Sequence, residues 1–360
     1  MHGGAVPFIT SLVKNPFTMN DATLTPVSEI EATLISDLKE CINLLPASWS
    51  GQDLARATSG AAATLLGKIY LRNHDYANAK TYIDMVLNSG QYELESDFKY
   101  VWSENNKYGK EMIFALLHET GNNAAEIACH FGPSDHPEVP GRWQYYGVSL
   151  PFWRSYDKED PRREFFYYDY TGDAKRDDQS DYGFHYMVPE EGVTVVPNDT
   201  TKYMQNVATM KYTYDMISDA YYDGRTICIF RLSDVILCKA EIENNLNGPA
   251  AALPYLNQIR ARAGAPEYGK HNRFPAPSTK ETMNDAILKE RGYELVFEFQ
   301  RRADLIRFGK YEEVVNAHLK KLGIAQPTNV TSSLRYFPYP LNDAQLNPNL
   351  AAENPSRLPK

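Results

Sequence analysis

Apolar residues recur at helical spacing near the start of the chain. Between residues 27 and 45 they fall at intervals of three and four, at Ile30, Leu34, Leu38, Cys41 and Leu45. This spacing puts them on one face of an amphipathic helix, which Pro46 should end because proline cannot continue it. Ser28 and Glu31 form a candidate capping box at its start.

Small residues indicate two pairs of packed helices. Residues 61–70 contain Leu66-Gly67-Lys68-Ile69-Tyr70, the pattern of a tetratricopeptide repeat, and a partner helix should run from Asp75 to a stop at Gly90. We expect Leu66, Gly67 and Ala79 at the contact between the two helices. A second pair is predicted over 233–244 and 250–263, closed by Gly264, and Pro254 should begin or kink its second helix. One pair cannot bury its own faces, so the pairs should stack into a mainly α, tetratricopeptide-like scaffold.

Residues 285–311 have the pattern of one further amphipathic helix. An apolar stripe is formed by Leu288, Leu295, Phe299, Ala303 and Ile306. Charged residues gather on a neighbouring arc: Arg291, Glu294, Glu298, Arg301 and Arg302. We expect this arc, together with Asp304, to fix packing through ion pairs rather than to carry catalysis.

Regular periodicity fades between the helical parts. Residues 111–119 are apolar enough for a short strand, residues 122–148 are irregular, and residues 150–160 are predicted as a short helix. We therefore expect one domain over 1–360, with a helical scaffold (about 27–100 and 226–325), an irregular, loop-rich ligand-facing insertion with short strands (about 101–225) and an extended tail (326–360). A long irregular segment on rigid helices is where a binding site is usually found.

The composition narrows the classes of ligand. A formal net charge of −9 offers no broad basic surface to nucleic acid. Of 25 tyrosines, 13 lie between residues 142 and 222, and a phenol ring suits an amphipathic partner such as a sugar. The four cysteines have no C-x-x-C spacing, which argues against a zinc or redox site.

The sequence contains only weak signals for catalytic or metal-binding groups. The best metal set, Cys129, His130, Asp135 and His136, fits no standard ligand spacing, and residues 173–181 lack the glycine and glutamate of a calcium loop. No nucleophile elbow or phosphate-binding glycine loop is present, and no carboxylate pair can be singled out among 46 acidic residues. We expect no cofactor, no metal and no enzymatic activity.

The predicted ligand-binding residues lie in the insertion. The rings of Trp143, Tyr145 and Tyr146 could stack on sugars, with Arg142, Gln144 and His130 as polar neighbours. The alternative is that this cluster packs the insertion onto the helices. Tyr182, His185 and Tyr186 form a second candidate cluster.

Several motifs together carry a resemblance to a known family. The stretch 285–311 contains Glu290-Arg291, Glu294-Leu295, Phe297-Glu298, Gln300-Arg301, Asp304-Leu305 and Gly309-Lys310. Other matching segments are Asp37-Leu38, Leu45-Pro46, Asp160-Pro161-Arg162, Arg231-Leu232-Ser233-Asp234 and, in the tail, Phe337-Pro338-Tyr339-Pro340 with Asn347-Pro348-Asn349-Leu350. In this order they resemble the SusD/RagB family of outer-membrane lipoproteins, which hold glycans, and sometimes peptides, at the mouth of a TonB-dependent transporter.

The resemblance implies a function and a location. It implies a surface-exposed glycan-binding protein of the outer membrane that works with a SusC-like TonB-dependent transporter. Gly4-Ala5-Val6-Pro7-Phe8 looks like a segment that normally sits well inside such proteins. The membrane would then be reached only through a lipid anchor absent from this chain. A tetratricopeptide-type protein–protein adaptor is the main alternative, followed by a glycoside hydrolase.

Overall fold

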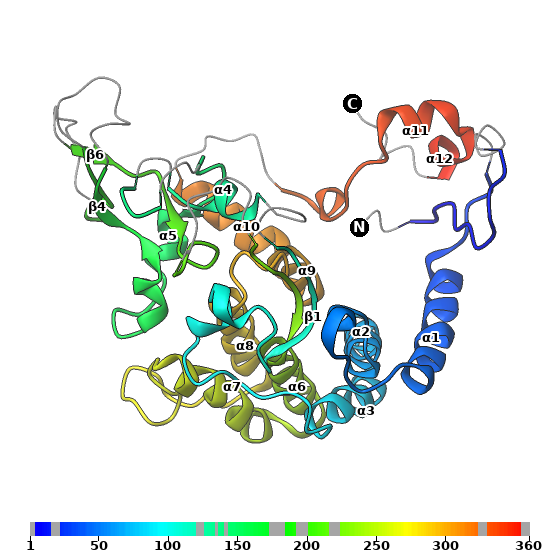
Figure 1. The fold of residues 1–360 in the computed structure, drawn as a ribbon, viewed down its shortest axis with the longest axis horizontal. Helices are drawn as coiled ribbons and strands as arrows, with labels where there is room; N and C mark the ends of the chain where they lie inside the picture. The colour runs from blue at the N-terminus through cyan, green and yellow to red at the C-terminus, as the bar shows by residue number, and fades with distance from the viewer. Residues whose placement is uncertain are drawn as a thin grey trace. The chain divides into compact units, whose positions relative to one another are not determined.

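The structure, a computed structural model, describes residues 4–15, 22–119, 126–133, 136–139, 143–172, 184–191, 201–215, 224–322 and 330–353. Within them helices predominate over short strands, which confirms the mainly α fold (Figure 1). The chain divides into two compact units, one of residues 45–301 and the other of residues 1–44 with 302–360. The single-domain organisation stays a prediction.

Stacked helices form the scaffold of the larger unit. Helix α3 packs against both α2 and α6, and α8 packs against α6 and α7. The bounds are α2 (Ser59–Arg72), α3 (Tyr76–Leu87), α6 (Leu232–Asn247), α7 (Pro249–Ala263) and α8 (Lys280–Glu294).

Close packing between α2 and α3 depends on small residues, as the repeat pattern predicted. A Cβ added at Gly67 would lie 2.9 Å from Cδ1 of Ile83, which leaves no room for a side chain. Leu66 and Ala79 are fully buried. The side chain of Asp75 accepts a hydrogen bond from the backbone N–H of Asn78 and caps α3.

Helix α7 ends as expected but begins earlier. Gly264 has a φ of +73°, the left-handed conformation that suits a C-terminal glycine. The helix starts at Pro249, because the first residue of a helix needs no N–H for an intrahelical hydrogen bond. Pro254 therefore lies inside the helix and does not begin it.

The predicted single helix over 285–311 is wrong. Helix α8 ends at Glu294, and the stretch continues as α9 (Arg301–Arg307) and α10 (Tyr311–Lys321). Between α8 and α9, Phe297 and Phe299 each have a φ of +60°, which is incompatible with a right-handed helix. The Phe299 side chain is 71% exposed and Ala303 is exposed too, so neither belongs to an apolar stripe.

The insertion contains short strands, as expected. Strands β1 and β8 pair antiparallel, so the two ends of the insertion lie side by side. Two further sheets have the orders β2-β7-β3 and β4-β5-β6. The predicted helix over 150–160 is limited to α5 (Leu150–Trp153), because a turn follows it. The remaining elements of the unit are η2 (Gly51–Asp53), η3 (Tyr100–Trp102), η4 (Glu104–Asn106), β1 (Met112–Leu116), α4 (Ile127–Phe131), β2 (Val148–Ser149), η5 (Pro161–Glu164), β3 (Phe166–Tyr167), β4 (Asp169–Thr171), β5 (His185–Met187), β6 (Thr201–Tyr203), β7 (Asn206–Thr209) and β8 (Ile227–Arg231).

In the smaller unit, residues near the start of the chain pack against residues of the C-terminal segment. Buried Tyr339 and Leu350 pack with Val6, and the Tyr339 hydroxyl donates to the Ala5 carbonyl over 3.3 Å. The first predicted helix is confirmed as α1 (Val27–Leu44), but it begins before Ser28, so the proposed capping box is wrong. The tail, expected to be extended, contains η6 (Ser332–Arg335), α11 (Leu341–Leu346) and α12 (Pro348–Glu353).

Candidate ligand-binding site

Backbone hydrogen bonds fix the segment 143–146 against α4. The Trp143 N–H donates to the Cys129 carbonyl (2.7 Å) and the Tyr146 N–H donates to the His130 carbonyl (3.1 Å). Between them, the Gln144 N–H donates to the Gly132 carbonyl (3.1 Å). Three main-chain bonds within four residues hold the segment in one conformation without help from its side chains.

The predicted rings come together on the surface. Trp143, Tyr145 and Tyr146 are 38%, 65% and 54% exposed. The centroids of Trp143 and Tyr145 are 5.5 Å apart, and the His130 ring lies 5.1 Å from Trp143 and 5.5 Å from Tyr145. We call the rings of Trp143, Tyr145, Tyr146 and His130 the aromatic platform. Its members touch one another but leave large faces open to solvent.

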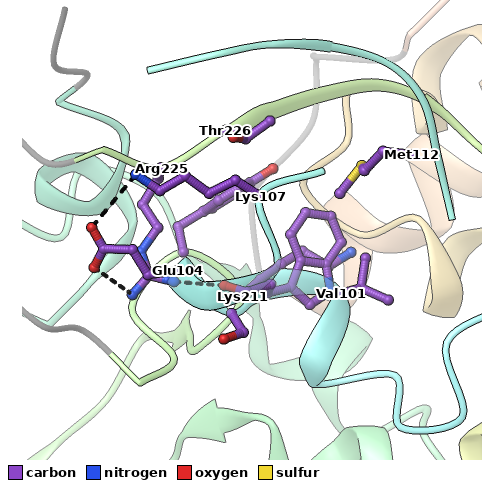
Figure 2. Close-up of a pocket in the computed structure, with 10 residues that line it drawn as sticks. Val101, Glu104, Lys107, Met112, Lys211, Arg225 and Thr226 are labelled. Atoms are coloured by element: carbon purple, nitrogen blue, oxygen red, sulfur yellow. Dashed lines mark hydrogen bonds and ion pairs between the residues drawn. The ribbon is translucent and has the colours of Figure 1, made fainter. Parts of the chain in front are cut away.

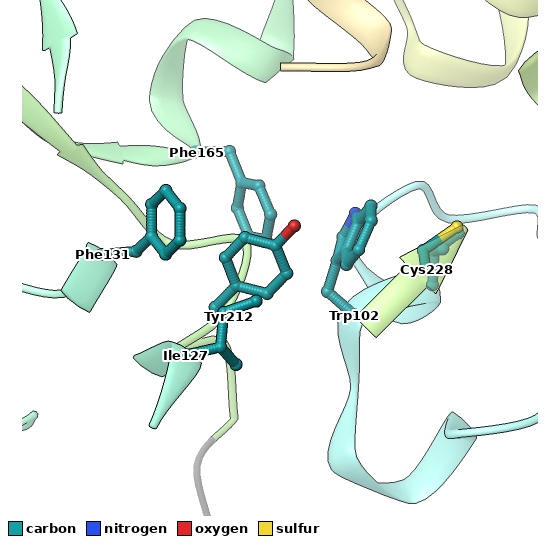
Figure 3. Close-up of a cluster of buried hydrophobic side chains, with 7 residues drawn as sticks. Trp102, Ile127, Phe131, Phe165, Tyr212 and Cys228 are labelled. Carbon is teal, nitrogen blue, oxygen red and sulfur yellow. The ribbon is translucent and has the colours of Figure 1, made fainter. Parts of the chain in front are cut away.

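A buried aromatic cluster supports the platform from below. Phe131, at the end of α4, lies 5.2 Å from Tyr146, 5.1 Å from Tyr212 and 4.8 Å from Phe297, measured between ring centroids. Figure 3 shows Phe131 and Tyr212 with Trp102 and Phe165. Phe131, which the sequence did not single out, contacts Tyr146 from the core, while Trp143, Tyr145 and Tyr146 keep exposed surface.

Polar groups of the site are fixed as well. The His130 Nδ1 lies 2.7 Å from the Glu126 carbonyl, and because a carbonyl oxygen only accepts, Nδ1–H is the donor of this hydrogen bond. Gln144 has a φ of +48°, a strained conformation for glutamine, and its side-chain amide donates to Oδ1 of Asn206 over 3.2 Å. Asn206 had no signal in the sequence, since it comes from β7. Arg142 lies outside the described residues.

The other predicted clusters are described only in part. His136 packs against the rings of Tyr167 and Tyr170, and Asp135 lies outside the described residues. Within the part that is described, no three His, Cys, Asp or Glu side chains gather as metal ligands. The Tyr186 ring stacks on Tyr170 at 5.1 Å, whereas residues 173–181 and Tyr182 fall outside the described ranges.

A network of buried ion pairs joins the insertion to the scaffold. Arg231 contacts the carboxylates of Glu111, Glu294 and Glu298, each at 2.7 Å. Further members are Asp160, Arg162, Lys211, Arg260, Arg262 and Glu290. Burial would raise the pKa of Glu294, yet Arg262, Arg231 and Arg162 hold that pKa well below its usual range. These charges are paired with one another inside the protein, which fits the packing role expected of Glu294 and Glu298.

The two ends of the insertion are also joined directly. Arg225 donates to the carbonyls of Trp102 (2.5 Å) and Tyr214 (2.6 Å) and faces the carboxylate of Glu104 (Figure 2). The Glu104 N–H donates to Asp215 over 3.2 Å. The chain therefore leaves the scaffold and returns to it at one point.

Comparison with known proteins places the chain in a family. The sequence model of the SusD family matches residues 110–356. The chain belongs to the SusD family. A SusD-like protein P25 from Formosa agariphila is 26% identical, over 96% of this chain and 67% of that protein.

Solved structures show the same fold. A SusD superfamily protein from Bacteroides vulgatus has a TM-score of 0.71 at 24% identity, covering 97% of this chain and 72% of that one. A surface glycan-binding protein A from Bacteroides thetaiotaomicron, in complex with laminarihexaose, has a TM-score of 0.67 at 21% identity, covering 91% and 70%. Among the described residues of this SusD-family chain, no helix combines the length and the apolarity needed to cross a membrane.

Proposed function

We propose that this SusD-family protein binds an oligosaccharide on its aromatic platform at the cell surface and delivers it to a TonB-dependent outer-membrane transporter. The observation that carries the proposal is the exposure of three adjacent large rings, Trp143, Tyr145 and Tyr146, on a rigid base. Groups of exposed aromatic side chains on a soluble protein mark interaction sites.

The chemistry of the platform matches a sugar. The C–H face of a pyranose can lie on an aromatic ring, while its hydroxyl groups need fixed donors and acceptors at the edge. Gln144, Asn206 and Nε2 of His130 supply such groups beside the rings. Because the segment is already held by main-chain bonds, little conformational freedom is lost on binding.

Family membership supports the same assignment. A protein of the same fold has been solved in complex with laminarihexaose. Outer-membrane location and the transporter partner rest on the family resemblance. A protein–protein adaptor should present a concave groove lined by polar side chains, so the exposed platform favours the glycan. We propose a binding protein rather than an enzyme.

Calorimetry with laminarihexaose and a panel of neutral and acidic oligosaccharides tests the binding step. Trp143→Ala and Tyr145→Ala should each weaken binding by about 1–2 kcal/mol, roughly tenfold, because each removes one stacking face. Tyr100→Ala is the matched control, since Tyr100 is 43% exposed and lies outside the platform. Circular dichroism checks folding.

If both variants bind with the same affinity as the parent protein, the binding site lies elsewhere. The stacked rings of Tyr170 and Tyr186 are then the next candidates. Delivery is tested separately in cells. Platform variants should slow growth on the bound glycan without slowing growth on its free monosaccharide, and unchanged growth on the glycan would argue against delivery through this site.

A further inference from the structure

A strained residue lies in the middle of the aromatic platform. Gln144 has a φ of +48°, in the left-handed region that a residue with a long side chain rarely adopts. It is the single residue between Trp143 and Tyr145, whose ring centroids lie 5.5 Å apart at an interplanar angle of 37°. The backbone conformation of Gln144 therefore determines how these two rings stand relative to each other.

The strained residue also keeps the platform segment at one end of α4. The last carbonyls of a helix have no partner within the helix. Those of Cys129 and His130 accept hydrogen bonds from the N–H groups of Trp143 and Tyr146, which lie on the two sides of Gln144. The chain reaches the same helix end twice because it turns between these two residues. A strained conformation persists only where the surrounding structure holds it.

A side chain from β7 holds the turn. The side-chain amide of Gln144 donates to Oδ1 of Asn206 over 3.2 Å. Asn206 is fixed in its turn, because it pairs with Ser149 where β2 and β7 run antiparallel. Its side chain packs directly on Gly147, where an added Cβ would lie only 2.5 Å from Oδ1. The glycine therefore leaves room for the Asn206 amide beside the platform.

We propose that Asn206 is a positioning residue for the platform, which holds the Gln144 turn and thereby keeps the rings of Trp143 and Tyr145 in the arrangement that binds glycan. Its action goes through Gln144 and is separate from any contact that Asn206 makes with the ligand. Without the Oδ1 acceptor, the segment relaxes toward unstrained conformations in which the two rings are no longer held side by side. The consequence for affinity rests on the proposed function, whereas the consequence for the ligand-free protein does not.

Amide hydrogen exchange in the ligand-free, full chain tests the positioning role. The N–H groups of Trp143, Gln144 and Tyr146 donate to α4 and its cap, and peptides covering residues 143–147 report their exchange. Asn206→Ala should speed this exchange about three- to tenfold, the effect of losing one side-chain hydrogen bond. Asn206→Asp is the matched control, because its carboxylate keeps an acceptor at the same place, and it should exchange at the parent rate.

A double-mutant cycle shows whether Asn206 acts through Gln144. In a Gln144→Ala background, Asn206→Ala should have no further effect on the exchange rate, because the acceptor no longer has a donor to hold. Calorimetry with laminarihexaose on the same four proteins should follow this pattern. Asn206→Ala alone should weaken binding about three- to tenfold, because the apparent affinity falls with the fraction of the protein in the competent conformation.

The outcomes separate this proposal from the proposed function. Unchanged exchange in Asn206→Ala, or additive effects of the two substitutions, would overturn the positioning role even if binding weakened, since Asn206 would then be a ligand contact alone. Equally faster exchange in peptides from α6 and α7 would also overturn it, because it would reveal a general loss of stability. If the parent protein bound no oligosaccharide, the proposed function would fail, while local exchange would still report whether Asn206 holds the turn.

Discussion

Two regions of the larger unit hold their side chains in opposite ways. In the buried ion-pair network, the side chains that contact Arg231 are no more than 4% exposed and are fixed by side-chain bonds. In the aromatic platform, the main chain is fixed and the rings of Trp143, Tyr145 and Tyr146 are more than one-third exposed. A substitution in the first region should therefore change stability, and one in the second should change binding.

Removing the centre of the network should have the largest effect. Arg231→Ala removes a guanidinium that contacts the buried carboxylates of Glu111, Glu294 and Glu298, and breaking such buried pairs typically costs about 3–5 kcal/mol in the free energy of unfolding. Urea unfolding measures it. Arg273→Ala is the control, because its ion pair with Asp157 is exposed and should be worth less than about 1 kcal/mol. Equal effects would show that the buried pairs do not organise the unit.

Acid should weaken the same network without a mutation. The pKa values of Glu294 and Glu298 are lower in the folded protein than their usual value of 4.5, so their contribution is complete above that pH. It is lost as the pH falls below about 4.5 toward the folded-state pKa values. Urea unfolding at pH 7, 5, 4 and 3 should show this loss as a fall in the free energy of unfolding. In Glu294→Gln, the free energy of unfolding should fall less steeply with pH. An unchanged slope in that variant would contradict the assignment.

Overpacking the first helix pair should have an intermediate effect. Gly67→Leu forces a side chain against Ile83 and should lower the free energy of unfolding by about 1–3 kcal/mol. Ala77→Leu, at an exposed position of α3, adds the same side chain without a clash. Thermal unfolding of the two variants compares them, and a Gly67→Leu protein as stable as the control would mean that the helices can separate freely.

The platform should show the smallest effect on stability. Tyr145 is 65% exposed, so Tyr145→Ala should change the free energy of unfolding by less than about 0.5 kcal/mol while weakening glycan binding about tenfold. Chemical unfolding and calorimetry on the same sample give both numbers. A large loss of stability would contradict the conclusion that the platform contributes to binding and the buried network to stability.

The sequence predicted the elements whose causes are local. Helical spacing and the small residues Gly67 and Ala79 lie within one helix pair, so the pair could be recognised without knowing the rest of the fold. The break after α8 could not be recognised in this way. At this break, Glu298 contacts Arg231, a residue 67 positions away in the chain. The helical spacing of apolar residues continues through the break, so the sequence pattern alone does not indicate it.

The candidate site was predicted in part for the same reason. Trp143, Tyr145 and Tyr146 are neighbours in the chain, and their composition was enough to select them. Asn206 meets Gln144 across 62 residues, and Phe131 contacts Tyr212 and Phe297 from distant segments. Such partners are set by the folded arrangement of strands, which a single sequence does not reveal.

The joined ends of the insertion have a consequence for how the protein can diversify. Arg225 and Asp215 bring residues 102–104 close to Tyr214, and β1 pairs with β8 beside them. Length and sequence can therefore change in parts of the insertion that do not contact the helix pairs, whereas Glu111, Arg162 and Lys211 keep the buried ion pairs that join it to the scaffold. One scaffold can then carry different recognition surfaces as long as these anchoring residues are retained.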